Sequence, residues 1–258
     1  MLVGTCGYSY RDWVGPFYPP GTRSGAMLDY YAHRFPCVEI DSSYYRVPNE
    51  ATIASMDRRT PKGFRFTVKL PGTVTHVPGD LDNPPLDDAL VFRESLSPLV
   101  EAKKLGAVLM QFPNSFRPGV RAERHIRRLR DALNGLPLVA EFRHRGWQSS
   151  ETLHLLERLD IGWCNVDTPR FDTLPRPSSD VVGDIAYVRF HGRNAAMWWK
   201  GDAAERYDYI YAPEELEPWA ARVSEMASAA RETYVFFNNH RFGQAASSAT
   251  LFARMLRG

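Results

Sequence analysis

Eight short apolar runs, rich in residues that favour β-strands, recur along the chain and limit its fold more than any other feature. Their apolar content is nearly continuous, as in parallel strands that helices cover from outside. The predicted strands are Leu2–Cys6, Val38–Asp41, Phe64–Lys69, Ala107–Phe112, Leu138–Phe142, Gly162–Val166, Ile185–His191 and Thr233–Phe237.

Helical patterns lie between most of these runs. Ile126, Leu129 and Leu133 share one face of a predicted helix, and Pro213 suits the first turn of another. Strands that alternate with helices indicate βαβ units and a parallel sheet. Eight such units in 258 residues predict a closed (β/α)8 barrel of the TIM type, with residues 1–258 as one domain. A doubly wound open sheet is the alternative, but no GxGxxG or Walker-type loop supports it.

Composition argues against several other classes of protein. The net charge of +2 is too small to indicate a nucleic-acid binder, so a nucleic-acid partner is only weakly supported. No apolar run approaches the roughly 18 residues that a membrane span needs, and no signal peptide precedes the first strand. Three widely separated cysteines in apolar runs suggest reduced, buried thiols. We therefore expect a cytoplasmic protein without a membrane partner; its oligomeric state stays open.

The ends of the predicted strands carry more polar side chains than a purely structural barrel needs. In this fold, the loops that follow the strands build the site. Alternation places Glu39 and Asp41 on the same side of the second strand. The predicted site residues at or after the strand ends are Glu39, Asp41, Lys69, His76, Gln111, Glu141, Arg143, Asp167, Arg189, His191, Asn238 and Asn239. Long loops at Leu70–Pro85 and Thr168–Asp180 are expected over the same face.

Buried charges are costly unless they are paired. We therefore expect Glu39 to pair with Lys69, and Glu141 to pair with Arg189 or Arg143. One interpretation is a polar pocket for a ligand. The alternative is that these ion pairs only fill the mouth of the barrel.

Four histidines that follow strands are candidate metal ligands. These are His76, His144, His191 and His240, and carboxylates lie at neighbouring strand ends. No HxH or HExxH spacing is present, so no metal ligand is assigned and no cofactor is expected. A divalent metal remains an alternative.

Three further segments have both a functional and a structural interpretation. Gly243, at the start of the last predicted helix, could let an anion approach free backbone N–H groups, with Arg241 or Asn239 assisting. Trp198 and Trp199 could stack on a sugar or base, or could cap the barrel. The arginine-rich helix that begins near Arg121 is interpreted as an outer, solvated face.

Several motifs in order resemble the YecE-like family, which is also called domain of unknown function 72. The matching segments are Gly4–Tyr10 with Trp13, Phe17–Pro19, Val38–Tyr45, Phe66–Lys69, Thr75–His76, Gln111–Pro113, Glu141–His144 with Trp147, Tyr187–Gly192 and Phe236–Asn239. Tyr8 and Tyr44 lie in these motifs and complete the predicted substrate-binding set. Gly146 and Ser248 depart from the family pattern, where Ser and Asn are expected. The resemblance implies a barrel fold and no particular reaction.

Three hypotheses compete for the function. The first is an enzyme of hydrolase or lyase type that acts on a small polar or anionic, possibly phosphorylated, substrate. Here Glu39, Lys69, Glu141 and His191 would be catalytic, and the other site residues would bind substrate. The second is a metal-assisted nucleic-acid or nucleotide phosphodiester enzyme. The third is a ligand-binding barrel without catalysis.

Overall fold

The computed structural model describes residues 1–76, 81 and 86–257 of the chain. In this part, eight parallel strands form a closed barrel in sequence order. The strands are β1 (Leu2–Cys6), β2 (Cys37–Ile40), β3 (Arg65–Lys69), β4 (Leu105–Phe112), β5 (Leu138–Phe142), β6 (Ile161–Asp167), β7 (Ile185–Phe190) and β8 (Glu232–Phe237). The predicted (β/α)8 barrel is confirmed, and every predicted strand agrees with the observed one to within two residues at each end.

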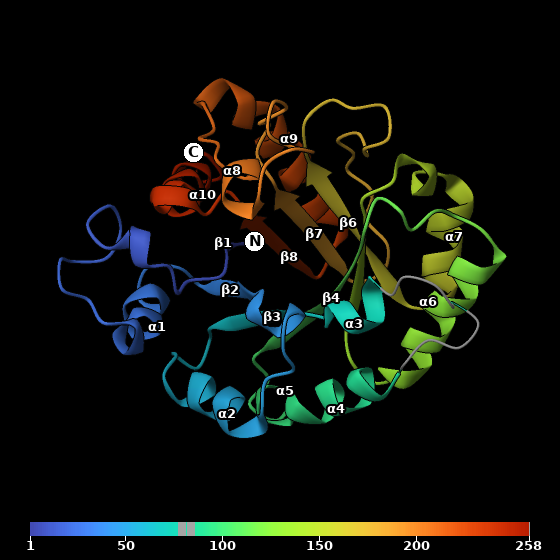
Figure 1. The fold of residues 1–258 in the computed structure, drawn as a ribbon, viewed down its shortest axis with the longest axis horizontal. Coiled ribbons are helices and arrows are strands. Elements are labelled where there is room, and N and C mark those ends of the chain that lie inside the picture. Colours follow the sequence, from blue (N-terminus) through green and yellow to red (C-terminus); the bar gives the residue numbers. More distant parts are fainter. Residues whose placement is uncertain (77–80, 82–85, 258) are drawn as a thin grey trace.

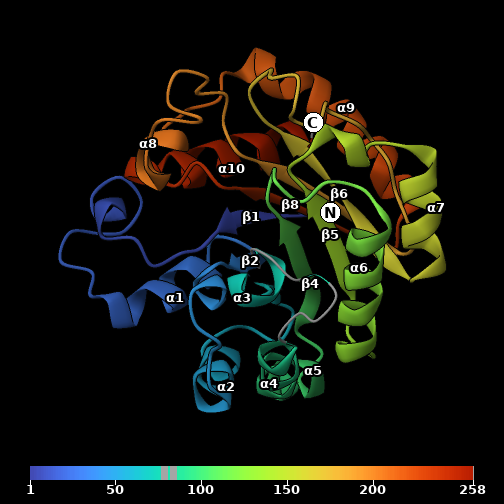
Figure 2. The same cartoon turned by 45° about the vertical axis from the view of Figure 1, so that its right-hand side comes forward.

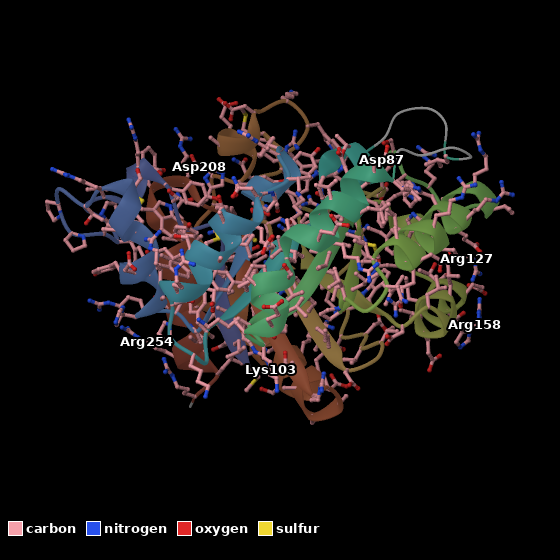
Figure 3. All side chains as sticks on the ribbon, turned by 90° about the horizontal axis from the view of Figure 1, so that it is seen from below. Asp87, Lys103, Arg127, Arg158, Asp208 and Arg254 are labelled. Carbon is pink, nitrogen blue, oxygen red and sulfur yellow. The ribbon has the colours of Figure 1, made fainter. Side chains whose placement is uncertain are left out.

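Helices surround the strands on the outside of the barrel (Figure 1). They are α1 (Ser24–Ala32), α2 (Glu50–Arg58), α3 (Gly72–Thr75), α4 (Asp87–Ser95), α5 (Ser97–Glu101), α6 (Val120–Ala132), α7 (Ser150–Arg158), α8 (Ala203–Arg206), α9 (Pro213–Ala229) and α10 (Gln244–Met255). Pro213 is the first residue of α9, as predicted, and Ile126 and Leu129 of α6 are fully buried. The apolar stripes of the helices thus cover the outer side of the sheet. Arg127 lies on the exposed face of α6 (Figure 3).

Inward and outward side chains alternate along each strand, and this alternation gives the barrel two cores. Val38 and Ile40 of β2 belong to the outer core, between strands and helices. Cys37 belongs to an inner core, and the same strand turns Glu39 inward. All three cysteines are buried and free of disulfide bonds. The polar interior positions collect toward the C-terminal ends of the strands, where the site forms.

Two ends of the barrel can be followed in the view of Figure 3. Asp208 belongs to the segment after β7, whereas Lys103 directly precedes β4, and the two lie at opposite ends of the molecule. The end near Asp208 is therefore the C-terminal face. The predicted helix-free connection after β6 is observed, because residues 168–184 contain no helix.

The predicted loop Leu70–Pro85 begins with the single turn of α3, and its residues 77–80 and 82–85 lie outside the described part. Among the described helices, none is both long enough and apolar enough to cross a membrane.

Candidate functional site

A cavity of about 470 Å³ opens at the C-terminal ends of the strands. Nine residues predicted for the site line it: Tyr8, Asp41, Tyr44, Lys69, His76, Gln111, Arg143, Arg189 and Asn238. They end or follow seven different strands, so the closure of the barrel brings together residues that are far apart in the sequence. The convergence of strand ends at one face is the property that makes this fold a common scaffold for active sites.

Arg189 forms the floor of the cavity and joins two buried glutamates. Its Nη1 donates to Glu141 Oε2 at 2.6 Å, and its Nη2 donates to Glu39 Oε1 at 2.6 Å. Tyr187 also donates to Glu39, at 2.6 Å from Oε2. The predicted pair of Glu39 with Lys69 was wrong. Lys69 lies on the neighbouring strand β3, but Arg189 of β7 extends across the barrel interior and pairs with Glu39 instead.

Glu141 is the acceptor at the centre of the buried network. It accepts hydrogen bonds from Arg143 Nε and Arg189, so both alternatives predicted for its partner occur together. Burial alone would raise the pKa of Glu141, but Arg143 and Arg189 hold that pKa well below its usual range. Glu141 is therefore a fixed carboxylate.

His191 is held in one tautomer by its neighbours. Its Nδ1 faces two donors, Arg143 Nη2 at 3.3 Å and Asn238 Nδ2 at 3.1 Å, so this nitrogen must accept. Its Nε2 lies 3.1 Å from Glu141 Oε1 and therefore carries the proton. Burial, with Arg143 nearby, lowers the pKa of His191 to about 3. The imidazole is neutral and donates to Glu141.

Three of the four residues predicted to be catalytic lie under the cavity floor. Glu39, Glu141 and His191 have no exposed surface, and none of them lines the cavity. Burial raises the pKa of Glu39 to about 7, against the lowering effect of Arg189. These residues position Arg189 and Arg143, and only Lys69 of the predicted four reaches the cavity.

One cluster of possible metal ligands occurs among the described residues, formed by Cys6, Glu39 and Asp41. Arg189 Nη2 lies 2.6 Å from Glu39 Oε1, 3.4 Å from Cys6 Sγ and 3.6 Å from Asp41 Oδ1. The guanidinium therefore occupies the centre that a metal ion would need. Burial also raises the pKa of the Cys6 thiol well above its usual range, which opposes the thiolate that binds metals.

None of the four histidines considered for a metal belongs to a cluster of possible metal ligands among the described residues. His144 accepts from its own turn at Gly146 N, His240 stacks on Tyr10 with ring centroids 4.8 Å apart, and His191 is held in the buried network. His76 lines the cavity, and burial lowers its pKa to about 4, so it is neutral at pH 7.

Asp167 was predicted for the site and does not lie there. Val166 faces the barrel interior, so alternation turns Asp167 outward against α9. Its carboxylate accepts from Arg193 at 2.9 Å, from Tyr211 at 2.7 Å and from Trp219 at 3.0 Å. Asp167 instead binds residues of the segment that follows β7 and holds this segment against the barrel.

The two side chains that were expected to assist an anion near Gly243 have internal partners. Arg241 pairs with Asp208 at 2.5 Å, and Asn239 donates to the carbonyl of Tyr209 at 2.6 Å. Gly243 has a φ of +75°, which favours glycine, and a Cβ there would approach Pro16 to 3.2 Å. Neither Asn239 nor Gly243 lines the cavity. Gly243 provides the left-handed backbone conformation that precedes the first residue of α10.

Tyr207 and Arg206 line the cavity. Arg206 was not predicted, and Tyr207 was predicted only as one of the aromatic residues that could stack on a sugar or base. Both residues lie at the end of α8, which the ribbon views place beside α10 (Figures 1 and 2). Burial would raise the pKa of Tyr207, but Arg143, Lys69 and Arg189 lower it below its usual range. The segment 191–212 lacks any apolar period. The only sequence signal was its aromatic content, which predicted stacking.

A second cavity of about 300 Å³ adjoins the first. Six residues line both cavities: Tyr44, His76, Gln111, Arg143, Arg206 and Tyr207. Its remaining wall includes Leu174, Trp198 and Trp199. The first cavity is basic and phenolic, whereas this wall is mainly apolar. The two compartments of the mouth therefore share a polar boundary and differ in their remaining walls, which in the second cavity are Pro113, Asn114, Leu174, Trp198 and Trp199.

These features define a (β/α)8 barrel with a basic cavity above a buried ion-pair network. A family model described as a protein of unknown function, DUF72, matches residues 2–258. The chain belongs to the DUF72 family, as the motifs in its sequence indicated.

Relatives of the chain support this membership along its length. It is 30% identical to the UPF0759 protein YunF of Bacillus subtilis (strain 168), over 99% of this chain and 94% of that protein. It is also 30% identical to the UPF0759 protein YecE of Escherichia coli (strain K12), over 46% of this chain and 39% of that protein.

Among solved structures, a DUF72 family protein from Thermotoga maritima MSB8 is 39% identical with a TM-score of 0.93 and covers 100% of this chain and 99% of that one. A second one, from Enterococcus faecalis V583, is 29% identical with a TM-score of 0.87, over 100% of this chain and 95% of that one.

Proposed function

We propose that this protein is an enzyme that binds a small anionic substrate in the basic cavity and catalyses proton transfer there. One observation carries the proposal, the excess of cations around the cavity. The described lining residues include one carboxylate, Asp41, and four cations: Lys69, Arg143, Arg189 and Arg206. Cations stay in excess even when the glutamates beneath the floor are counted as ionised. Such a cavity attracts anions.

Two of these cations have hydrogen-bonding capacity left for a ligand. In the part of the chain that the structure describes, Lys69 and Arg206 form no ion pair. Lys69 Nζ lies over the ring of Tyr44, 4.3 Å from its centroid. Arg206 Nε is buried and has no hydrogen-bond partner. A buried unpaired donor is costly, and an anionic group of a substrate would satisfy it.

Tyr207 is the proposed proton-transfer residue. Its phenol lines the cavity, and the positive charge of Arg143 acts on it to lower its pKa, against the effect of burial. The surrounding cations stabilise the phenolate, which can accept a proton from the substrate and return it to the product or to water. Glu39, Glu141 and His191 act as positioning residues, because they hold the two arginines without touching the cavity. This role matches acid/base chemistry of hydrolase or lyase type.

The anion site is tested by titrating the protein with inorganic phosphate and with acetate in a calorimeter. We expect Lys69→Met and Arg206→Met each to weaken binding about tenfold, because each removes a charged hydrogen-bond donor. Lys62→Met is the matched control, since Lys62 is exposed and does not line the cavity. Equal affinity in all four proteins would contradict the proposal.

Catalysis is tested by a turnover screen of small phosphate and carboxylate esters and hydroxy acids. Tyr207→Phe keeps the ring and removes the proton, so it should abolish turnover while anion binding persists. Turnover that a chelator abolishes and a divalent ion restores would favour the metal-assisted enzyme instead. Binding without any turnover would favour the ligand-binding barrel.

A further inference from the structure

We infer that the substrate carries a flat aromatic or heteroaromatic ring beside its anionic group, and that the ring binds in the second cavity. This inference rests on the proposed function, because it uses the same anion site. It assigns each compartment of the mouth to one part of the ligand. The ring lies against Trp199, and the anionic group lies at Arg143 and Arg206.

The arrangement of the shared residues links the two compartments. Both arginines, Arg143 and Arg206, are among the six residues that line both cavities, so they lie on the boundary. An anionic group bound to the two arginines would direct its substituent into one compartment or the other. The first compartment is surrounded by phenols and cations. The second offers an apolar indole wall, which is the better partner for a ring without charge.

The two indole rings differ in how much of their surface is exposed to a ligand. Trp198 is 2% exposed, lies 5.8 Å from the Arg143 guanidinium and meets Tyr207 edge to face at 6.0 Å. It is already packed. Trp199 is 52% exposed, and its described aromatic neighbour is Phe171, at 5.8 Å and tilted by 58°. One large aromatic face therefore remains open to solvent at the rim of the second cavity, and a flat ring would cover it.

The segment that carries these residues is held at several points, which makes the wall preformed. Arg193 binds Asp167 and Glu215, both at 2.9 Å. Asn194 donates to the carbonyls of Glu205 and Asp208, at 3.0 and 3.3 Å. A preformed wall lowers the ordering cost of binding. The open face of Trp199 is thus a fixed feature next to the anion site.

The test compares pairs of ligands that differ by a ring. Phenyl phosphate and methyl phosphate form the first pair, and benzoate and acetate form the second, which tells whether the anionic group is a phosphate or a carboxylate. We expect the aryl member of one pair to bind about tenfold more tightly and to quench tryptophan fluorescence.

Trp199→Leu should remove this preference and leave the affinity for the methyl member unchanged. Phe242→Leu is the matched control, because Phe242 is 57% exposed but lines neither cavity. Trp199 is exposed enough for its variant to fold, which a melt checks.

The outcomes separate this inference from the proposed function. If aryl and alkyl anions bind equally, or if Trp199→Leu keeps the preference, the ring site is wrong and the anion site stands. If neither the anions nor phenol bind, both fail. If phenol binds in a Trp199-dependent way while methyl phosphate and acetate do not bind, the ring compartment stands and the proposed function fails.

Discussion

Replacing Glu141 by Gln should destabilise the protein far more than the same change at Glu39. Both carboxylates are fully buried and both lie 2.6 Å from the same arginine, so the two variants form a matched pair. They differ in charge state. Arg143 and Arg189 hold the pKa of Glu141 well below its usual range, whereas burial raises the pKa of Glu39 to about 7. Gln therefore replaces a fixed anion at Glu141 and a largely protonated acid at Glu39 below pH 7.

The magnitude at Glu141 follows from its contacts. One carboxylate oxygen accepts from Arg143 and His191, and the other accepts from Arg189. A Gln side chain can place its oxygen at only one of these positions, so its NH2 must face a donor at the other. Two guanidinium groups also lose their shared counter-ion. Breaking a buried pair in this way costs about 3–5 kcal/mol.

The pH dependence has opposite signs for the two glutamates. The depressed pKa of Glu141 contributes stability that is present above its unfolded value near 4.5 and is lost as the pH falls toward the folded pKa. The raised pKa of Glu39 works in reverse, because the folded protein holds the proton more tightly than the unfolded chain. The wild type therefore loses stability relative to Glu39→Gln as the pH rises from about 4.5 to 7.

Urea unfolding of wild type, Glu141→Gln and Glu39→Gln at pH 5 and pH 8 measures both effects. We expect Glu141→Gln to lose about 3–5 kcal/mol at both values. The cost of Glu39→Gln should shrink between them. A loss below about 1 kcal/mol at Glu141, the range of an exposed pair, or a Glu39→Gln cost that grows with pH, would refute this account.

Two further predictions concern the floor of the site and the wall of the barrel. His191 should stay neutral, with its proton on Nε2, between pH 5 and 8, and nitrogen-15 chemical shifts should show this; a titration between pH 5 and 7 would contradict the pKa of about 3. Gly4→Ala should cost about 1–3 kcal/mol in urea unfolding, because its Cβ would lie 2.3 Å from the carbonyl oxygen of Cys37. Gly63→Ala is the control, with no atom within 4 Å of the added carbon, and equal losses in both variants would count against a steric cause.

The fold could be predicted because each strand is a nearly continuous apolar run. Burial on both faces leaves a strong signal in composition, and the helical period between runs resolves the order of elements. The boundaries were accurate for the same reason. The prediction that residues 1–258 form one domain, and the cytoplasmic location, stay predictions.

The site could be predicted in part, since its residues stand at strand ends. Inward alternation identified Lys69, Arg143 and Arg189. Asp167 was included only because it follows the predicted sixth strand, and alternation from the inward Val166 would have placed it outside. The partner of Glu39 was missed because pairing was sought on the adjacent strand. Long side chains that point into a barrel form contacts across its interior, and which of them pair cannot be predicted from their positions in the sequence.

The segment after β7 was the hardest part to predict. Its position depends on contacts such as Arg193 with Asp167 and Arg241 with Asp208, which join residues far apart in the chain. Without a hydrophobic period, nothing local indicates where Tyr207 lies. Its role in the cavity follows only from the assembled structure.

The guanidinium of Arg189 gives the floor of the barrel a positive charge that is covalently attached to the chain. A metal ion in the same position could be removed by a chelator, exchanged for another ion, or lost when the supply is short. Burial acts to lower the pKa of Arg189, but the surrounding carboxylates raise it well above its usual range. The charge is therefore present in every copy of the folded protein, at any pH at which the protein folds and whatever ions surround it.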